Sequence, residues 1–497
     1  MKKKIIIIGG GTAGLILANN LQERFDVTLL EKSNNYKLPI VYRIPLLIGL
    51  LFKRKKRNFI KKNTILIDND RKIPIYYPNV LGGSSEINGC VHVFGSKKLW
   101  QILLKKFKLK YKDLIEVYNE TFNYQNNNPK KKKINLIDSF NNKLDIIFSK
   151  IFRDFKLKKI SSIFNDDIGF GKIVNNSNSY LRSSVLDLVS QKKFKLQLNC
   201  HVNKIFKKIE NDKTVYYVYS NNGIFKTEIL ILSLGTFGTS KLLLNCTKTI
   251  AELKNLKKLI GLGIKDHPNL RVNVFLNKSF NTLNEISNSF LKKFFLIIKF
   301  FFMFRTFLSG TGATTAFHIN LGKKEKKADT RINLLQFFES GRHDFRNLLN
   351  TSPGFSLSVT PVQSYSQGRI LVNDSGKSLI KFKYFKNRKD YSNIKKSLNF
   401  CLKLLQNSNI KKHIKNIDKL DIIKKNSKNY ILNNVYSGGH WIGGSSKIIN
   451  SYFQVKNLKN FYICDASVFD FHVSSNIHSS IILIANLFTK KILKKYN

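Results

Sequence analysis

Short apolar runs that end in glycine or in a single charge mark the start of the chain. Four isoleucines at 5–8 lead directly into the glycine-rich stretch 9–14, and a second apolar run at 27–30 ends at an acidic residue. This order predicts a strand, a tight turn, a helix and a second strand, which is the pattern of a dinucleotide-binding unit. Glycines let backbone N–H groups approach a pyrophosphate, and the carboxylate accepts ribose hydroxyls. The predicted contacts are Gly9, Gly11, Thr12, Ala13, Gly14 and Glu31.

Later segments carry other periodicities. Apolar and polar residues alternate at 355–359 and again at 369–372, which predicts strands of a sheet with one exposed face. Residues 395–405 carry apolar side chains on one side of a predicted helix. The chain has no apparent internal repeat, and its 497 residues suffice for two lobes with substantial cores.

The chain is strongly basic, with 86 Lys and Arg against 31 Asp and Glu and a net charge of +55. Lysine, asparagine, isoleucine and phenylalanine are abundant whereas proline, methionine and tryptophan are scarce, as an A/T-rich coding sequence produces. Charge alone gives only non-specific attraction to nucleic acid, and no recognised reading module accompanies it. We therefore expect no specific nucleic-acid partner.

Cysteine usage and the N-terminus indicate a reducing compartment. The five cysteines show no paired spacing of a disulfide framework or a metal site. The initial apolar run has four residues, too few for a signal peptide. These features predict a cytoplasmic protein, with a peripheral position on the inner face of the membrane as the alternative.

Distant segments decide between a flavin and a nicotinamide cofactor. A second glycine-serine loop lies at 77–91, and 438–444, 461–469 and 474–476 follow near the end. Together with the N-terminal fingerprint, they resemble the glucose-methanol-choline (GMC) family of FAD-dependent oxidoreductases. Three further segments follow in the family's order, so that the resemblance runs nearly end to end: 180–184, 229–236 and 263–268.

The resemblance implies an α/β fold with a discontinuous Rossmann-like FAD-binding domain and a substrate-binding domain of antiparallel sheet and helices. We expect the FAD-binding domain at 1–120, 178–270 and 432–497. The substrate-binding domain is then expected at 121–177 and 271–431.

The resemblance also implies the reaction, an FAD-dependent oxidation of an alcohol or sugar CH–OH group to the carbonyl with hydride transfer to flavin N5. It favours a dehydrogenase over an oxidase, and leaves the electron acceptor open among oxygen, a quinone and a protein. A flavin-containing lyase without net redox chemistry is the alternative on the same fold. A membrane or nucleic-acid binding protein with structural FAD is the third.

Two residues match the family's catalytic pair. His440 matches the histidine of the family's His-x-x-Gly motif and would act as general base, for which an imidazole suits neutral pH. Asn476 matches the second member, whose amide donates to the substrate oxygen. His478 is the rival for that role, because a proline usual after the pair is absent here. A structural histidine in a glycine-rich turn and a helix-capping asparagine are the plainer alternatives.

The resemblance implies the remaining FAD contacts. They lie in the second glycine loop, at the adenine end and in two C-terminal turns: Gly82, Gly83, Ser84, Asn88, Val202, Asp465, Ala466 and Ile477. Where some relatives carry a histidine that binds FAD covalently, this chain has Ile87, so we expect non-covalent FAD. We assign no metal, because His92, His267 and His343 lack ligand spacing.

One segment is not explained by a flavin site. Residues 290–308 are rich in phenylalanine but are interrupted by lysines too often to span a bilayer. If helical, Lys292, Lys293 and Lys299 fall within an arc of about 120°. Residues 45–52, followed by the basic run 53–57, repeat the pairing of apolar and basic residues. Contact with an anionic membrane would suit both segments, whereas a buried helix and a solvated loop are the favoured interpretation.

Overall fold

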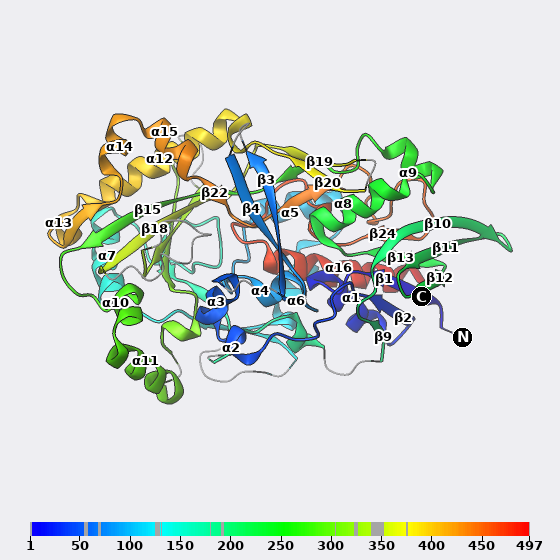
Figure 1. Cartoon of the computed structure of the whole chain (residues 1–497), viewed down its shortest axis with the longest axis horizontal. Helices are drawn as coiled ribbons and strands as arrows, with labels where there is room; N and C mark the ends of the chain where they lie inside the picture. Colours follow the sequence, from blue (N-terminus) through cyan, green and yellow to red (C-terminus); the bar gives the residue numbers. More distant parts are fainter. Residues whose placement is uncertain are drawn as a thin grey trace.

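In the computed structural model the first apolar run forms the central strand of a parallel sheet. The sheet has the order β24-β13-β1-β2-β9 (Figure 1). Its strands are β1 (Lys4–Ile8), β2 (Asp26–Leu30), β9 (Lys195–Gln197), β13 (Ile229–Leu232) and β24 (Phe461–Ile463). All four pairings are parallel. Parallel neighbours need crossover connections, and distant parts of the chain therefore meet in this one sheet.

The structure describes residues 2–53, 58–67, 71–124, 130, 132–178, 180–189, 193–303, 305–322, 327–338, 352–373 and 376–496.

Helices cover the parallel sheet. The first helix, α1 (Thr12–Leu21), packs against the last, α16 (His478–Tyr496). A small antiparallel sheet adjoins them, with β10 (Val202–Glu210), β11 (Lys213–Ser220) and β12 (Gly223–Thr227), next to α8 (Gly235–Cys246) and α9 (Ala251–Leu256). The isoleucines of β1 are all buried in the larger apolar core. Four successive apolar residues suit a strand that is buried on both faces.

A six-stranded sheet of order β23-β14-β19-β20-β3-β4 lies beside this unit. Its strands are β3 (Ile60–Ile67), β4 (Arg71–Pro78), β14 (Leu262–Lys265), β19 (Gly368–Val372), β20 (Ser378–Lys381) and β23 (Ile442–Gly444). Ile370 and Ile380 pack into the larger core. The strand predicted at 369–372 is therefore present. It pairs with β14 and β20 rather than with the sheet that contains 355–359.

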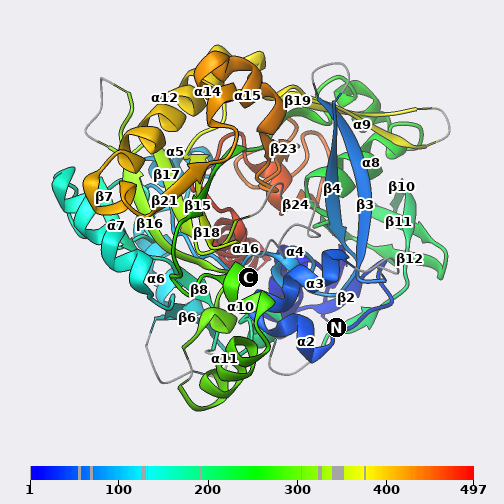
Figure 2. The ribbon, with the colours of Figure 1, turned by 60° about the vertical axis from the view of Figure 1, so that its left-hand side comes forward.

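A seven-stranded antiparallel sheet forms the other lobe, in the order β21-β15-β18-β17-β16-β7 with β22 paired to β15 (Figure 2). Its strands are β7 (Gly169–Lys172), β15 (Pro268–Leu276), β16 (Ala313–Ile319), β17 (Thr330–Leu335), β18 (Gly354–Pro361), β21 (Ile414–Ile417) and β22 (Tyr436–Ser437). Helix α12 (Arg388–Leu405) covers β15 and β18 and contains the helix predicted at 395–405.

The prediction of an exposed face for 355–359 is wrong, because every residue of β18 is buried. Phe355, Leu357 and Val359 pack in the second apolar core beneath α12. Of the alternating polar residues, Ser356 bonds to Asn273, and Ser358 lines an internal cavity. The polar side of this strand therefore faces the interior of the molecule.

The remaining elements surround these sheets. The strands β5 (Phe122–Tyr124), β6 (Ile134–Asp138) and β8 (Val174–Asn176) form a small sheet. The helices are α2 (Ile40–Arg43), α3 (Ile48–Lys53), α4 (Ser84–Ile87), α5 (Lys97–Lys106), α6 (Tyr111–Thr121), α7 (Lys143–Asp154), α10 (Leu283–Asn288), α11 (Phe290–Met303), α13 (Ser408–Lys411), α14 (Leu420–Lys425) and α15 (Ser427–Asn434). Short 3-10 turns include η1 (Pro45–Leu47), η3 (Phe307–Ser309) and η6 (Ala466–Val468).

The predicted α/β class, with a Rossmann-like unit and an antiparallel sheet, is confirmed. The exact domain boundaries stay a prediction. Within the range predicted for the substrate domain, β19 and β20 share a sheet with β3 and β14.

Helix α11 differs from the favoured interpretation of 290–308. Most of its apolar side chains are exposed, and Phe300 is buried. A buried helix is therefore wrong for this segment. Across the described ranges, we find no helix that is both long and apolar enough to cross a membrane. The basic run at 54–57 lies outside the described residues.

Substitutions in the glycine turn 9–14 test how closely α1 packs on β1. A methyl group on Gly14 would lie 1.8 Å from the Gly9 carbonyl oxygen, whereas one on Gly11 would meet only the Ser233 carbonyl oxygen at 4.0 Å. We expect Gly14→Ala to destabilise the cofactor-free protein by about 1–3 kcal/mol, the range of overpacking. Gly11→Ala is the matched control and should melt like the wild type. Equal melting temperatures for Gly14→Ala and the wild type would contradict the close packing of α1 on β1.

Candidate active site

A cavity of about 1540 Å³ lies between the parallel sheet and the antiparallel sheet. Drug-sized ligands occupy pockets of about 300–1,000 Å³, so this cavity has room for a dinucleotide and a second molecule. Most of the predicted site residues line it: Gly9, Gly11, Thr12, Ala13, Glu31, Gly83, Ser84, Asn88, Val202, His440, Asp465, Ala466, Asn476 and Ile477. Gly14 and Gly82 lie outside the lining and act in the packing of the two glycine loops.

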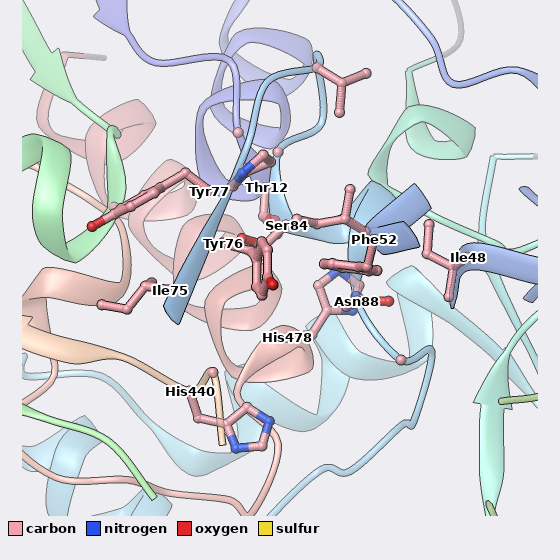
Figure 3. Close-up of a pocket in the computed structure, with 18 of the residues that line it drawn as sticks. Thr12, Ile48, Phe52, Ile75, Tyr76, Tyr77, Ser84, Asn88, His440 and His478 are labelled. Atoms are coloured by element: carbon pink, nitrogen blue, oxygen red, sulfur yellow. The ribbon is translucent and has the colours of Figure 1, made fainter. Parts of the chain in front are cut away.

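The two glycine loops touch each other at one end of the cavity. The Gly82 N–H donates to the Gly10 carbonyl at 2.8 Å. A methyl group on Gly83 would lie 2.9 Å from the Gly11 Cα, and Gly83 has a φ of 59°. A side chain at Gly83 would therefore push the loops apart. The contact places the N-terminus of α1 beside Ser84 and Asn88 (Figure 3).

The carboxylate of Glu31 lies at the far end of β2. One oxygen accepts the Gly10 N–H at 2.7 Å and the other accepts the Ser33 N–H at 2.7 Å. Burial raises the pKa of Glu31, and these hydrogen bonds oppose the shift. The two bonds leave further lone pairs on the oxygens, which suit ribose hydroxyls.

Basic side chains surround the same end of the cavity. Lys32, Lys61 and Lys241 line it together with His201. Desolvation lowers the pKa of Lys32, and the positive charges of Lys61 and Lys241 lower it further. The pKa of His201 is lowered by desolvation and by the same lysines. Positive groups that repel one another in this way favour an anion between them.

The turn that starts with Asp465 follows β24 at the edge of the parallel sheet. Its carboxylate accepts hydrogen bonds from the Gly235 N–H at 2.9 Å and the Ser467 N–H at 2.7 Å. The Thr239 hydroxyl also donates to it, at 2.5 Å. Burial raises the pKa of Asp465. The carboxylate therefore ties η6 to the start of α8, and leaves Ala466 at the cavity wall.

Arg182 holds the second glycine loop from behind. It is fully buried, and its guanidinium donates to the Ser85 carbonyl at 3.1 Å and to the Asn88 carbonyl at 3.1 Å. Burial raises the pKa of neighbouring Glu86, and the positive charge of Arg182 opposes that shift. Arg182 therefore positions Asn88 at the cavity.

His440 is held by a buried carboxylate. The backbone N–H of His440 donates to Asp266 Oδ1 at 2.7 Å. The hydroxyls of Tyr384 and Ser437 donate to Asp266 Oδ2, each at 2.6 Å. His472 Nε2 meets the His440 carbonyl oxygen at 2.8 Å. Hydrogen bonds therefore hold both the backbone N–H and the backbone carbonyl of His440.

His267 fixes the protonation pattern of the His440 ring. Its Nε2 lies 3.2 Å from the Val362 carbonyl, which is an acceptor, so Nε2 carries the proton. Burial lowers the pKa of His267 to about 4, so the ring is neutral at pH 7 and Nδ1 is an acceptor. His440 Nδ1, 3.1 Å away, must donate to it. His440 Nε2 then carries a lone pair, as a general base requires.

Asn476 lies next to that lone pair. Its Nδ2 is 3.1 Å from His440 Nε2. The amide N–H therefore donates to the atom that would take a substrate proton. A substrate hydroxyl would have to replace this contact, and the amide would then be free to donate to the substrate oxygen.

His478 lines the same cavity but belongs to another hydrogen-bond chain. Its Nδ1 meets Asn176 Nδ2 at 3.0 Å, and Asn176 Oδ1 meets His92 Nδ1 at 3.0 Å. Burial lowers the pKa of His478 to about 4. Figure 3 shows His478 near Asn88 and apart from His440. The geometry therefore favours Asn476 over His478 as the partner of His440.

Four residues of this site were not predicted as site residues: Arg182, Asp266, His267 and His472. Arg182 and Asp266 lie in segments noticed only for their order along the chain, and His267 was considered only as a metal ligand. His472 stacks on His267 with ring centroids 3.7 Å apart, and only its place shortly before the final helix could have signalled it.

The described ranges contain no cluster of three or more His, Cys, Asp or Glu side chains that could hold a metal ion. His343 lies outside them.

We compared the sequence and the fold of this chain with those of known proteins. Residues 364–485 match the family model described as GMC oxidoreductase. An alcohol dehydrogenase (acceptor) from Pseudomonas putida is 22% identical over 540 residues, which cover 99% of this chain and 95% of that protein. A formate oxidase from Aspergillus oryzae, solved to study the modification of its FAD, has a similar structure. Its TM-score is 0.82 at 16% identity, with 99% of each chain covered. A fungal aryl-alcohol oxidase has a TM-score of 0.79 at 12% identity, with coverage of 100% and 99%.

The alcohol dehydrogenase and the solved structures align with nearly the whole chain, whereas the family model matches residues 364–485. The predicted resemblance to GMC oxidoreductases is confirmed, by the family-model match over residues 364–485 and by the fold that the chain shares with these structures.

Proposed function

We propose that this protein binds FAD without a covalent link and oxidises the CH–OH group of an alcohol to a carbonyl, with His440 as general base. The observation that carries the proposal is the hydrogen-bond chain from Val362 through His267 to His440, which leaves a lone pair on His440 Nε2 at the cavity. A sugar stays the alternative substrate class.

The cavity residues fit FAD. The glycine turn at the N-terminus of α1 suits a pyrophosphate, and the Glu31 carboxylate suits an adenosine ribose. The space above Gly11 is open, since a methyl group there would meet only one atom within 4 Å. Ser84 and Asn88 would lie against the flavin ring, and Val202 against the adenine. When bound, FAD supplies the two-electron acceptor that takes the hydride from the substrate carbon.

Residues of the chain take the substrate proton and hold the reacting groups in position. His440 Nε2 takes the hydroxyl proton, and its Nδ1–H keeps the bond to His267. The Asn476 amide turns from His440 to the substrate oxygen, where negative charge develops. Asp266 holds the His440 backbone in place. Base and donor approach the hydroxyl from two different segments.

The type of electron acceptor is a separate proposal. The curated relative is named an acceptor-dependent alcohol dehydrogenase, whereas the structural neighbours include oxidases. We propose a dehydrogenase, in which turnover with an artificial acceptor exceeds oxygen consumption. Anaerobic bleaching of the flavin by an alcohol would separate either enzyme from a lyase or a binding protein. A cytoplasmic location is likewise proposed from the sequence alone.

The cofactor proposal is tested by acid precipitation of the yellow protein. We expect FAD in the supernatant, because Ile87 offers no nucleophile at the cavity wall. Flavin that stays in the pellet would mean covalent attachment. A colourless protein that FAD cannot reconstitute would overturn the function as a whole.

Rapid mixing with substrate tests the base. His440→Ala should keep its FAD and lower the rate of flavin reduction by ~10² to 10⁴, about 3–5 kcal/mol of barrier. Asn476→Ala should lose less. The control is His478→Ala, which we expect to reduce its flavin near the wild-type rate. The opposite ranking of the two histidine variants would assign the base to His478.

The role of His267 as a positioning residue is tested by rescue. His267→Ala should lower the rate of flavin reduction at saturating substrate by about tenfold or more with little change in substrate affinity, because the proton on His440 is no longer directed to Nδ1. His267→Gln keeps a donor and an acceptor in one side chain and should recover part of the rate. Equal rates for the two variants would show that His267 only fills space.

A further inference from the structure

The exposed side of α11 is the largest apolar feature on the described surface that the catalytic site does not explain. Seven of its apolar side chains are 49–79% exposed: Phe290, Leu291, Phe294, Phe295, Ile297, Phe301 and Phe302. Single exposed apolar residues are ordinary, but a contiguous set on one helix marks a binding surface. The helix projects at the lower edge of the molecule in both views (Figures 1 and 2).

A second exposed apolar group lies on the same lower side. Ile40 is 71% exposed, and Val41 and Leu50 are also exposed. These residues belong to α2 and α3, which flank η1. The chain after α11 forms η3, which packs against η1. The two groups are therefore parts of one structural region rather than separate protrusions.

The charges of this region have one sign. Residues 290–308 and 36–53 contain lysines and arginines but no aspartate or glutamate. On α11, Lys293 and Lys299 are exposed, while Lys292 lies 3.6 Å from Glu285 of α10. Phenylalanines flanked by lysines are the composition of helices that lie in the surface of an anionic bilayer.

A second copy of the chain fits this surface poorly. A twofold dimer would bring the same patch, with the same lysines, against itself, and each copy carries a net charge of +55. Like charges would repel across such an interface. An anionic lipid surface attracts the lysines and accepts the phenylalanines as well.

The cavity reaches the surface in this region. Ile297, Phe301 and Leu50 are exposed and also line the cavity. Further apolar residues of α11, η1 and α3 continue the lining inward: Leu296, Phe300, Leu46, Leu47, Ile48 and Phe52. His440 and Asn476 line the same cavity. An apolar wall therefore leads from the exposed helix toward the proposed catalytic pair.

We propose that α11, together with Ile40, Val41 and Leu50, docks on the surface of an anionic lipid bilayer, and that an apolar alcohol dissolved in the bilayer enters the cavity between α11 and α3. The second half of this proposal rests on the proposed alcohol oxidation. The first half does not.

Vesicle flotation tests the docking. We expect the holoprotein to float with vesicles of phosphatidylglycerol and phosphatidylcholine, and to float less with phosphatidylcholine alone. At 1 M salt the Debye length falls to ~3 Å, so lysine attraction is screened while insertion of phenylalanine is not. Part of the protein should therefore stay bound.

Matched variants locate the contact. Phe294, Phe295 and Phe302 are exposed and do not line the cavity, so the triple serine variant should fold and keep FAD but lose the salt-resistant binding. Ile209→Ser with Ile224→Ser is the control, since these isoleucines are exposed on β10 and β12. Absence of flotation, complete release at 1 M salt with the phenylalanines intact, or equal loss in the control would overturn the docking. A wild-type dimer in gel filtration that the triple variant dissolves would assign the surface to a second copy.

Access from the bilayer is tested with two alcohols. A long-chain alcohol dissolved in vesicles should reduce the flavin of the triple serine variant at least several-fold more slowly than that of the wild type, whereas a water-soluble alcohol should act equally on both. Equal rates with the vesicle-dissolved alcohol would overturn access from the bilayer. Flotation of a wild-type protein whose flavin no alcohol reduces would refute the proposed function and still support the docking.

Discussion

The architecture of the site depends on one backbone contact, in which the Gly82 N–H donates to the Gly10 carbonyl and Gly83 packs on Gly11. One loop opens the first helix of the parallel sheet, and the other carries Ser84 and Asn88. The loops approach this closely because Gly10 and Gly83 have no side chains: a methyl group would lie 2.7 Å from Leu81 in the first case and 2.9 Å from the Gly11 Cα in the second. Arg182 and Asp465 then fix the flanking segments, so that parts of the chain from both ends surround one cavity.

Much of this could be predicted from the sequence where a local rule governs the structure. The four isoleucines of β1, the glycines after them and Glu31 predict a βαβ unit because each has a specific steric or hydrogen-bonding role. The strand at 355–359 was predicted from alternation, but the location of its polar face was not. Alternation shows that two faces differ, and does not show whether the polar one meets solvent or an internal cavity. The exposed side of α11 was only the alternative to the favoured buried helix for a similar reason, because a phenylalanine-rich helix has the composition of a core.

The candidate active site shows the same limit. His440 and Asn476 were predicted from the resemblance to the GMC family, and their side chains lie 3.1 Å apart. Which nitrogen of His440 carries the proton depends on His267 and on the Val362 carbonyl, which lie just after β14 and β18. No local pattern encodes a contact between residues 173 positions apart. The burial that keeps His267 neutral is likewise a property of the assembled lobes.

The two faces of the seven-stranded sheet differ in their surroundings, since one packs in the apolar core and the other lines the cavity. The apolar side of β18 packs beneath α12, whereas Ser358 and Thr360 on its other side line the cavity, as does Asn333 of neighbouring β17. Exchanges among small residues at the cavity-facing positions would alter the shape and polarity offered to a substrate, and leave the core on the opposite face intact. A chain with this arrangement is able to change the shape and polarity of its cavity through single substitutions while its folded state persists.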